Sequence, residues 1–199
     1  MIRRLMLTAA VVSLAACNAP EPAQPAPTEP TPPPVEQPVP PATGANVLSA
    51  QGYGPLRIGM TRAEVEAALG ADANPAAVGG PDPQSCDQFR PARAPEGLLV
   101  MIENGVLTSI WLTRNPALET DRGVNVGDTA AEVRRAYGAS AISSPHKYES
   151  APAEYLTVWS TADHDSPAAR GVKFTVSADG KVQSIAGGGP SIQYVEGCA

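Results

Sequence analysis

A thirteen-residue block occurs twice in this chain of 199 residues. Residues 58–70 return 68 positions later as residues 126–138, and seven of the thirteen residues are identical. In each copy a threonine stands three residues before a glutamate, the spacing of a capping box, in which the hydroxyl and the carboxylate each accept a backbone N–H. Apolar residues then recur at intervals of three and four, and a glycine ends each copy. The pattern predicts two short amphipathic helices, over residues 61–69 and 129–137.

Glu64 and Glu132 occupy the same position in the two copies, and the role of their carboxylates has two interpretations. Brought together in space, they would form an acid pair of the kind that catalyses proton transfer. Placed three residues after Thr61 and Thr129, they are instead the reciprocal members of two capping boxes. The spacing already accounts for both carboxylates, so we favour the structural interpretation.

Apolar segments that follow each block indicate antiparallel strands. Asn104-Gly105 is a strong two-residue hairpin signal, and Asp179-Gly180 marks a second turn. The expected strands cover residues 85–90, 97–102, 106–113, 142–148, 155–160, 172–176 and 181–186. Helix and strands, twice, predict an α+β fold: a duplicated helix-plus-antiparallel-hairpin unit, with the helices packed on one face of an antiparallel sheet.

The two copies are expected to share one domain over residues 52–199, made of repeats 52–122 and 123–199. A single copy of about 70 residues has a marginal core, so fusion of the two is favoured. Before this domain, residues 18–44 hold eleven prolines, three glutamates and neither lysine nor arginine. This composition predicts that residues 18–51 form a disordered, extended tether, with a proline-motif ligand as the alternative.

The first residues have the pattern of an export signal. Arg3 and Arg4 precede an apolar run too short to span a membrane, and small residues lead to Cys17. This resembles the lipobox of bacterial lipoproteins, which implies that residues 1–16 are removed and that Cys17 is acylated, with palmitate or a similar chain. A plain signal peptide with a coincidental cysteine is the alternative. Such an anchor attaches a protein to a membrane without spanning it. In the lipoproteins that this pattern resembles, an Asp after the cysteine is associated with inner-membrane retention, so Asn18 implies the outer membrane, with the domain expected to face the periplasm.

The other two cysteines, Cys86 and Cys198, would then meet in an oxidising compartment. We expect them to form a disulfide that closes a loop of about 110 residues and restricts the unfolded chain by roughly 4–5 kcal/mol. Two free thiols at a metal or redox site are the alternative.

Charge and motifs argue against several functions. Without residues 1–16 the chain has 12 basic against 20 acidic residues, a net charge of −8, and no basic cluster, so nucleic acid is not an expected partner. The two histidines, His146 and His164, lack metal-binding spacing. The run Asp163-His164-Asp165 could hold a cation, but we favour a solvated loop. We expect no enzyme activity, cofactor, metal or small-molecule substrate.

The block Gly-Met-Thr-x-x-Glu-Val-x-x-x-Leu-Gly, residues 59–70, resembles the helix signature of the small BamE-type (SmpA/OmlA) outer-membrane assembly lipoproteins. The same unit in tandem is similar to the β-lactamase-inhibitor-protein fold, where two copies present a concave sheet to a partner. The resemblance covers residues 54–188 as a pattern, and it implies a protein that binds other proteins in the bacterial envelope.

Residues opposite one another in the hairpins predict which sheet face is free. The face toward the helices is expected to hold Leu99, Met101, Ile110, Phe174, Val176 and Ile185. The opposite face would hold the partner-binding candidates Leu98, Val100, Leu107, Trp111, Tyr155 and Trp159, together with Ile102. A patch bearing Trp and Tyr suits a protein interface. The alternative is that the linker, a terminal segment or the other repeat covers it.

These observations predict an envelope lipoprotein that acts as a non-catalytic protein-binding scaffold or accessory subunit at the outer membrane, with an envelope protein as its partner. The alternative is a periplasmic enzyme inhibitor that uses the concave sheet face.

Overall fold

Both repeated blocks form helices in the computed structural model of the protein, which describes residues 46–77 and 79–198. They are α1 (Arg62–Leu69) and α2 (Ala130–Tyr137), and each begins with a complete capping box at Thr61 or Thr129. Each ends at a glycine with positive φ, 89° at Gly70 and 59° at Gly138. The prediction of two capped helices is therefore confirmed.

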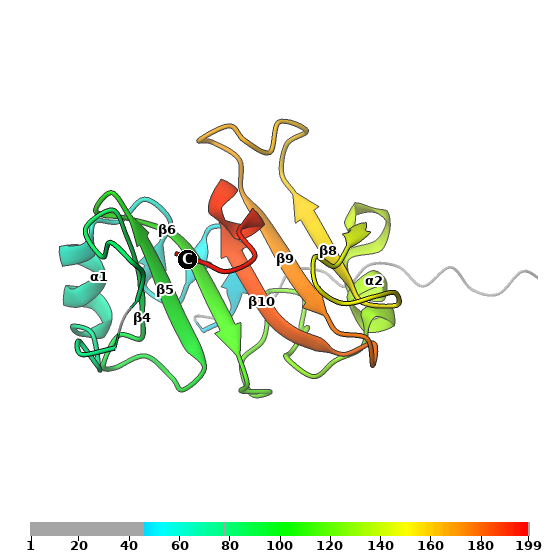
Figure 1. Ribbon diagram of the computed structural model, residues 1–199, viewed down its shortest axis with the longest axis horizontal. Coiled ribbons are helices and arrows are strands. Elements are labelled where there is room, and N and C mark those ends of the chain that lie inside the picture. The colour runs from blue at the N-terminus through cyan, green and yellow to red at the C-terminus, as the bar shows by residue number, and fades with distance from the viewer. Residues whose placement is uncertain (1–45, 78, 199) are drawn as a thin grey trace, which may run out of the picture. The chain divides into compact units, whose positions relative to one another are not determined.

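The strands form one antiparallel seven-stranded sheet in the order β4-β5-β6-β10-β9-β8-β7 (Figure 1). The two halves of the chain meet in its middle, where β6 pairs with β10. The strands are β4 (Cys86–Phe89), β5 (Leu98–Glu103), β6 (Val106–Thr113), β7 (Ile142–Pro145), β8 (Glu154–Trp159), β9 (Gly171–Val176) and β10 (Val182–Gly188). The fold is α+β, as predicted.

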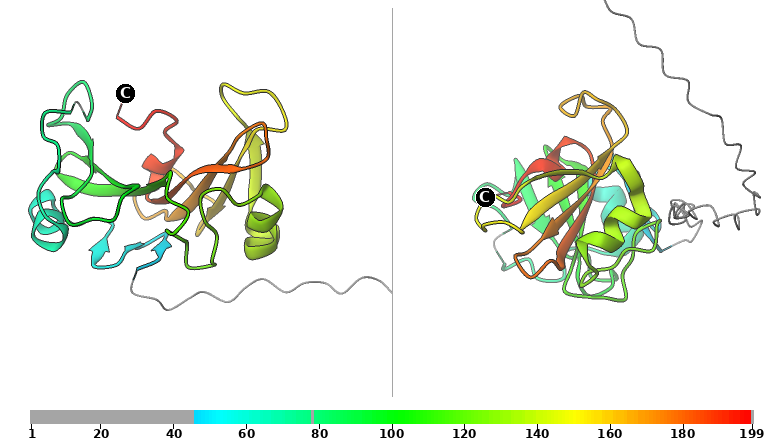
Figure 2. Two further views of the ribbon diagram at one scale, coloured as in Figure 1. Left: turned by 90° about the horizontal axis from the view of Figure 1, so that it is seen from below. Right: turned by 90° about the vertical axis from the view of Figure 1, so that its right-hand side faces the viewer.

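Figure 2 (left) shows both helices on one side of the large sheet and the C-terminal residues on the other. A small sheet of β1 (Leu48–Ser49), β2 (Gly52–Tyr53) and β3 (Leu56–Arg57) lies on the helix side. Two short 3-10 helices complete the fold, η1 (Gly138–Ser140) and η2 (Pro190–Gln193). The core lies between the helices and the large sheet, and its fully buried members include Leu56, Val65, Val133, Leu156, Phe174 and Ile185.

Each helix is attached to the hairpin of its own half in the same way. The N–H at the start of α1, from Arg62, donates to the carbonyl of Gly105 in the first hairpin turn at 3.0 Å. At the start of α2, Ala130 donates equally to Gly180 in the second turn at 3.1 Å. The capped block and its hairpin therefore form the same unit twice in space.

The expected faces of the first hairpin are wrong for β5 and for the part of β6 next to the turn. The turn at Asn104 and Gly105 has the positive φ values, 48° and 81°, that this turn requires. The pairs are Ile102 with Leu107 and then Met101 with Ser109, so Thr108 is a β-bulge without a partner. One extra residue reverses the faces on one side of the bulge relative to the other.

The bulge corrects the predicted faces as follows. Leu98, Val100, Ile102 and Leu107 lie in the core toward the helices, at most 3% exposed, and not on the free face. Leu99 packs with Trp111 on the opposite face. The predictions for Ile110, Phe174, Val176 and Ile185 are confirmed, since all four belong to the core cluster.

The folded domain begins earlier than predicted. Leu48 is fully buried, pairs with Tyr53 and forms a bridge to Thr120, so residues 48–51 belong to the domain and not to the linker. The physical reason is the burial of the apolar Leu48 side chain. The proline-rich composition of the preceding residues hides this start of the domain in the sequence. The predictions for residues 1–16, Cys17 and residues 18–45 lie outside the described residues.

Candidate protein-binding face

We call the side of the large sheet opposite the helices the reverse face. Its strands align side chains in one row from the first half of the chain to the second, because each pair of neighbours is in register. In order across the sheet, the row is Leu99, Trp111, Ala186, Lys173, Thr157 and Ile142. The two ends of this row have different surroundings.

The end of the row in the first half is covered by the C-terminal segment, residues 189–198. Ile192 of η2 is fully buried and packs on Trp111 and Ala186, which leaves Trp111 only 8% exposed. The indole Nε1–H of Trp111 donates to Ser109 Oγ at 2.9 Å. Gly171 makes room for this packing, because a Cβ there would lie 3.0 Å from Ile192 Cδ1 and 2.6 Å from the ring of Trp159. The strongest sequence candidate, Trp111, is thus covered by a terminal segment.

Hydrogen bonds and a disulfide hold the C-terminal segment on the reverse face. The N–H of Gly189 donates to the carbonyl of Thr108 at 2.9 Å. The Lys173 ammonium donates to the carbonyl of Gln193 at 3.2 Å. A disulfide joins Cys198 to Cys86 of β4, with an Sγ–Sγ distance of 2.06 Å and a sequence separation of 112 residues. The predicted disulfide is therefore confirmed, and it fixes the segment to the first half of the sheet.

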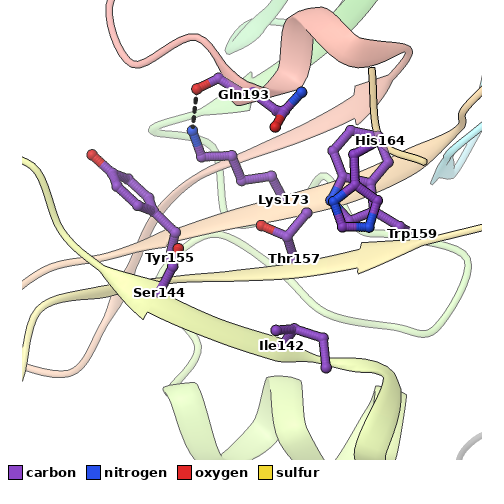
Figure 3. A pocket seen from close by; sticks show the side chains of 8 residues that line it. All are labelled: Ile142, Ser144, Tyr155, Thr157, Trp159, His164, Lys173 and Gln193. Atoms are coloured by element: carbon purple, nitrogen blue, oxygen red, sulfur yellow. Dashed lines mark hydrogen bonds between the residues drawn. The ribbon is translucent and has the colours of Figure 1, made fainter. Parts of the chain in front are cut away.

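The second half of the reverse face carries a cavity of about 260 Å³ between the C-terminal segment and the β7 edge. Strands β7, β8 and β9 supply its floor, and residues of the 160–170 loop and η2 supply its walls (Figure 3). Eight residues line it: Ile142, Ser144, Tyr155, Thr157, Trp159, His164, Lys173 and Gln193. We refer to it as the Lys173 pocket.

Stacked aromatic rings form two walls of the Lys173 pocket. The rings of Trp159 and His164 lie 4.8 Å apart and nearly parallel, at 13°. Tyr155 stacks on His146 at 4.7 Å, and its hydroxyl accepts the N–H of Lys147 at 3.3 Å. The histidine in each pair fixes its partner ring, so the pocket has rigid amphipathic walls of the kind enriched in protein interfaces.

Lys173 stands at the centre of the pocket floor and is only 5% exposed. Its Nζ donates to the carbonyls of Gln193 and Tyr194, at 3.2 and 3.4 Å, and lies 4.3 Å from the centre of the Tyr155 ring. Burial lowers the pKa of Lys173 from 10.5 to about 8. Among residues 46–77 and 79–198, no carboxylate forms an ion pair with it. The pocket floor therefore carries a positive charge without a negative partner.

The structure separates the six predicted partner-binding residues into three groups. Leu98, Val100 and Leu107 are core residues, and Trp111 is covered. Tyr155 and Trp159 line the Lys173 pocket. The sequence analysis did not name Lys173 as a site residue, although a charged residue between Val172 and Phe174 was the available signal.

The other side chains considered from sequence have structural roles. Glu64 Oε2 and Glu132 Oε2 each accept the N–H of their capping threonine, Thr61 or Thr129, at 2.7 Å. These backbone hydrogen bonds, followed by the threonine hydroxyls, lower the pKa of both carboxyls. The helices hold the two glutamates separately, in one capping box each, so they form no acid pair.

The described residues contain no cluster of three or more His, Cys, Asp or Glu side chains suited to a metal ion. In the run 163–165, His164 instead stacks on Trp159, and Asp165 accepts from the Gln193 amide at 3.2 Å. None of the helices in this part of the chain is long and apolar enough to cross a membrane.

Comparison with known proteins adds little to this geometry. No protein-family model matches the sequence, and no curated protein matches it. Among solved structures, the chain is similar to a cysteine-rich secretory protein, SAV1118, from Staphylococcus aureus. The identity is 13%, the match covers 76% of this chain and 50% of that chain, and the TM-score is 0.37. A likeness this weak supports no conclusion about fold or function.

Proposed function

We propose that this chain is a non-catalytic protein-binding subunit of the bacterial envelope, and that it binds its partner on the open half of the reverse face. The observation that carries the proposal is the division of that face. The C-terminal segment covers Trp111, whereas Trp159 stays partly exposed at the pocket, which the buried ring of Tyr155 also lines. Rigid aromatic side chains at a concave surface supply large contact area at a small entropic cost, which suits a protein interface.

The edge of the sheet beside the pocket also supports this interpretation. All four residues of β7 are exposed, and Ile142, 62% exposed, is the largest apolar side chain there. A partner that covered the pocket would also bury Ile142 and the β7 edge. The other edge strand, β4, is already occupied by the preceding loop, since Gln88 donates its N–H to Gly79.

The test is site-specific photo-crosslinking in intact cells. A photoreactive phenylalanine analogue replaces Ile142 at the pocket, and in a matched control it replaces Ala131, which is exposed on α2 on the other side of the sheet. The proposal expects a defined crosslinked protein from position 142 and not from position 131. Equal crosslinking from both positions, or none from position 142, would contradict it.

The membrane attachment is a separate part of the proposal, because Cys17 lies outside the described residues. It rests on the sequence pattern before that cysteine. Cells fed labelled palmitate should incorporate label into the wild-type protein and into a Cys86→Ser, Cys198→Ser double variant, and not into a Cys17→Ser variant. Label in the Cys17→Ser protein would exclude the lipid anchor at this position.

A further inference from the structure

We infer that the Lys173 pocket binds the C-terminal residue of a partner chain, with the carboxylate on Lys173 and an apolar side chain between Trp159 and Ile142. This inference rests on the proposed function, and it names the part of the partner that is recognised. The charge, the size and the walls of the pocket support it.

The charge of the pocket favours an anion. None of the eight lining residues is acidic, and Lys173 is the one formally charged side chain among them. Asp165 accepts a hydrogen bond from the Gln193 amide and does not line the pocket. A buried cation that faces only neutral groups is electrostatically incomplete, and a carboxylate would complete it.

The present contacts of Lys173 allow this exchange. Its two carbonyl acceptors lie at 3.2 and 3.4 Å, at or beyond the long end of the range for N–H···O hydrogen bonds. A carboxylate makes shorter and stronger charge-assisted hydrogen bonds with an ammonium group. Figure 3 shows Nζ bonded to the Gln193 carbonyl, and binding as proposed requires rotation about the terminal bonds of the side chain to turn Nζ toward the pocket.

The size of the pocket selects a single residue. Its volume of about 260 Å³ lies below the range typical of cofactor and drug-sized ligand sites, roughly 300–1,000 Å³. A terminal leucine or a residue of similar size fits such a volume, whereas a nucleotide or a flavin does not. The pocket therefore suits the tip of a chain and not a cofactor.

The walls select a terminal residue over an internal acidic one. The Trp159 ring and Ile142 present apolar surface in the same pocket that holds the ammonium group. A C-terminal residue carries its carboxylate and its side chain on one Cα, so it can contact the ammonium group and the apolar wall at the same time. An internal Asp or Glu would bring the carboxylate and leave the apolar wall without a partner.

The experiment uses the purified, disulfide-bonded protein with residues 1–17 replaced by an initiator methionine, and three probes. N-acetyl-leucine carries both groups, N-acetyl-leucinamide lacks the charge, and N-acetyl-glutamic acid α-amide carries only a side-chain carboxylate. Binding is followed by 1H–15N chemical-shift changes, with a Kd on the order of 1 mM expected for a ligand this small. We expect N-acetyl-leucine to bind at least tenfold more tightly than either other probe, and to shift Thr157 and His164.

Three variants test the assignment of the site. Lys173→Met removes the charge and keeps the stem, and it should abolish the preference for the acid over the amide. Ile142→Ala lies on the exposed edge, so it leaves the fold intact and should weaken N-acetyl-leucine severalfold. Lys181→Met makes the same change of charge at an exposed lysine on the second hairpin turn. It should change neither the preference for the acid over the amide nor the affinity for N-acetyl-leucine.

Each outcome supports or overturns one of the two proposals. Equal binding of the leucine acid and amide, no binding of the acid, or unchanged acid binding in Lys173→Met overturns the carboxylate site. Glutamate-probe binding as tight as that of the leucine acid overturns the assignment to a chain terminus. Crosslinking at position 142 that survives Lys173→Met leaves the proposed function standing without this inference. Acid binding without any crosslinking at position 142 supports the pocket and contradicts the proposed function.

Discussion

The buried charge of Lys173 predicts an unusual dependence of stability on pH. The lysine has a pKa of about 8 in the folded chain and 10.5 when solvated, so the folded state holds fewer protons than the unfolded state in and around this interval. Stability therefore rises as the pH rises through this interval, which is the opposite of the usual effect of alkali on lysines. The difference in pKa corresponds to about 3 kcal/mol, which destabilises the fold at pH 7.

Substitution by methionine isolates this effect. Lys173→Met removes the charge and also removes the two hydrogen bonds to carbonyls, which are worth about 1 kcal/mol each. At pH 7 the variant should be more stable than the wild type by about 1–2 kcal/mol. Between pH 7 and pH 9.5 the lysine loses its proton in the folded state, so this advantage should fall by about 2 kcal/mol.

Urea unfolding of the disulfide-bonded protein, followed by circular dichroism at pH 7, 8, 9 and 9.5, measures the difference. Only the difference between the two proteins is used, because the high pKa that burial gives Tyr137 lowers the stability of both in alkali. The matched variant Lys181→Met should show a difference that does not change with pH. A constant difference for Lys173→Met as well would refute the argument that burial of the lysine opposes its charge.

Four further outcomes follow from the contacts described above. Thr61→Ala should lower the free energy of unfolding by about 1 kcal/mol in urea titrations, because it removes one capping box. Val100→Asp should prevent folding, as seen in circular dichroism, and a native spectrum would mean that the bulge register is wrong. Ile192→Ala should cost about 2–5 kcal/mol and shift the fluorescence of Trp111 to longer wavelength, since the indole becomes exposed. Cys198→Ser should lower stability by up to about 5 kcal/mol, measured against the oxidised wild type.

Local signals in the sequence predicted the elements well because each depends on near neighbours. The capping boxes at Thr61 and Thr129 involve residues three positions apart, and the turn at Asn104-Gly105 needs only two. Strand β6 was predicted with its observed bounds, residues 106–113, because turn residues flank a continuous apolar run. Such short-range patterns can be recognised in the sequence without knowledge of the rest of the fold.

The faces of the first hairpin were not predictable by the same means. All five residues 98–102 are apolar, so alternation gives no indication of which face is inside. The assignment then depended on counting from the turn, and the bulge at Thr108 changes that count by one. The second hairpin has its own irregularity at Gln183 and a turn one residue longer, in which Ser177 bonds to Lys181. Neither irregularity has a sequence signature that pattern analysis recognises.

The Lys173 pocket was only partly predictable, because its walls come from distant segments. Tyr155 and Trp159 follow from the alternation of β8, but Gln193 arrives with the C-terminal segment and His164 with a loop. Where that segment lies depends on the long-range pairing of Cys86 with Cys198. The sequence predicted the disulfide, and it did not indicate which side of the sheet the segment would cross.

Divergence between the two copies explains why one half of the reverse face is covered and the other open. In the aligned row, Leu99 pairs with Trp111 in the first hairpin and Lys173 pairs with Ala186 in the second. The first pair provides a large apolar surface, on which Ile192 packs. The second pair replaces a leucine by a lysine and a tryptophan by an alanine, which leaves both space and a charge.

The C-terminal segment uses this difference. Ile192 rests on Trp111 and Ala186, and the main chain of the next residues accepts hydrogen bonds from Lys173, so the segment forms one wall of the pocket and stops there. Beyond it the row continues with Thr157 and Ile142, for which the described residues provide no cover. The same segment therefore covers the reverse face of the first copy and forms one wall of the pocket in the second copy. In the described part of the chain, the duplicated sheet in this way has one pocket along this row, and the residues at the equivalent positions of the two copies decide which copy carries it.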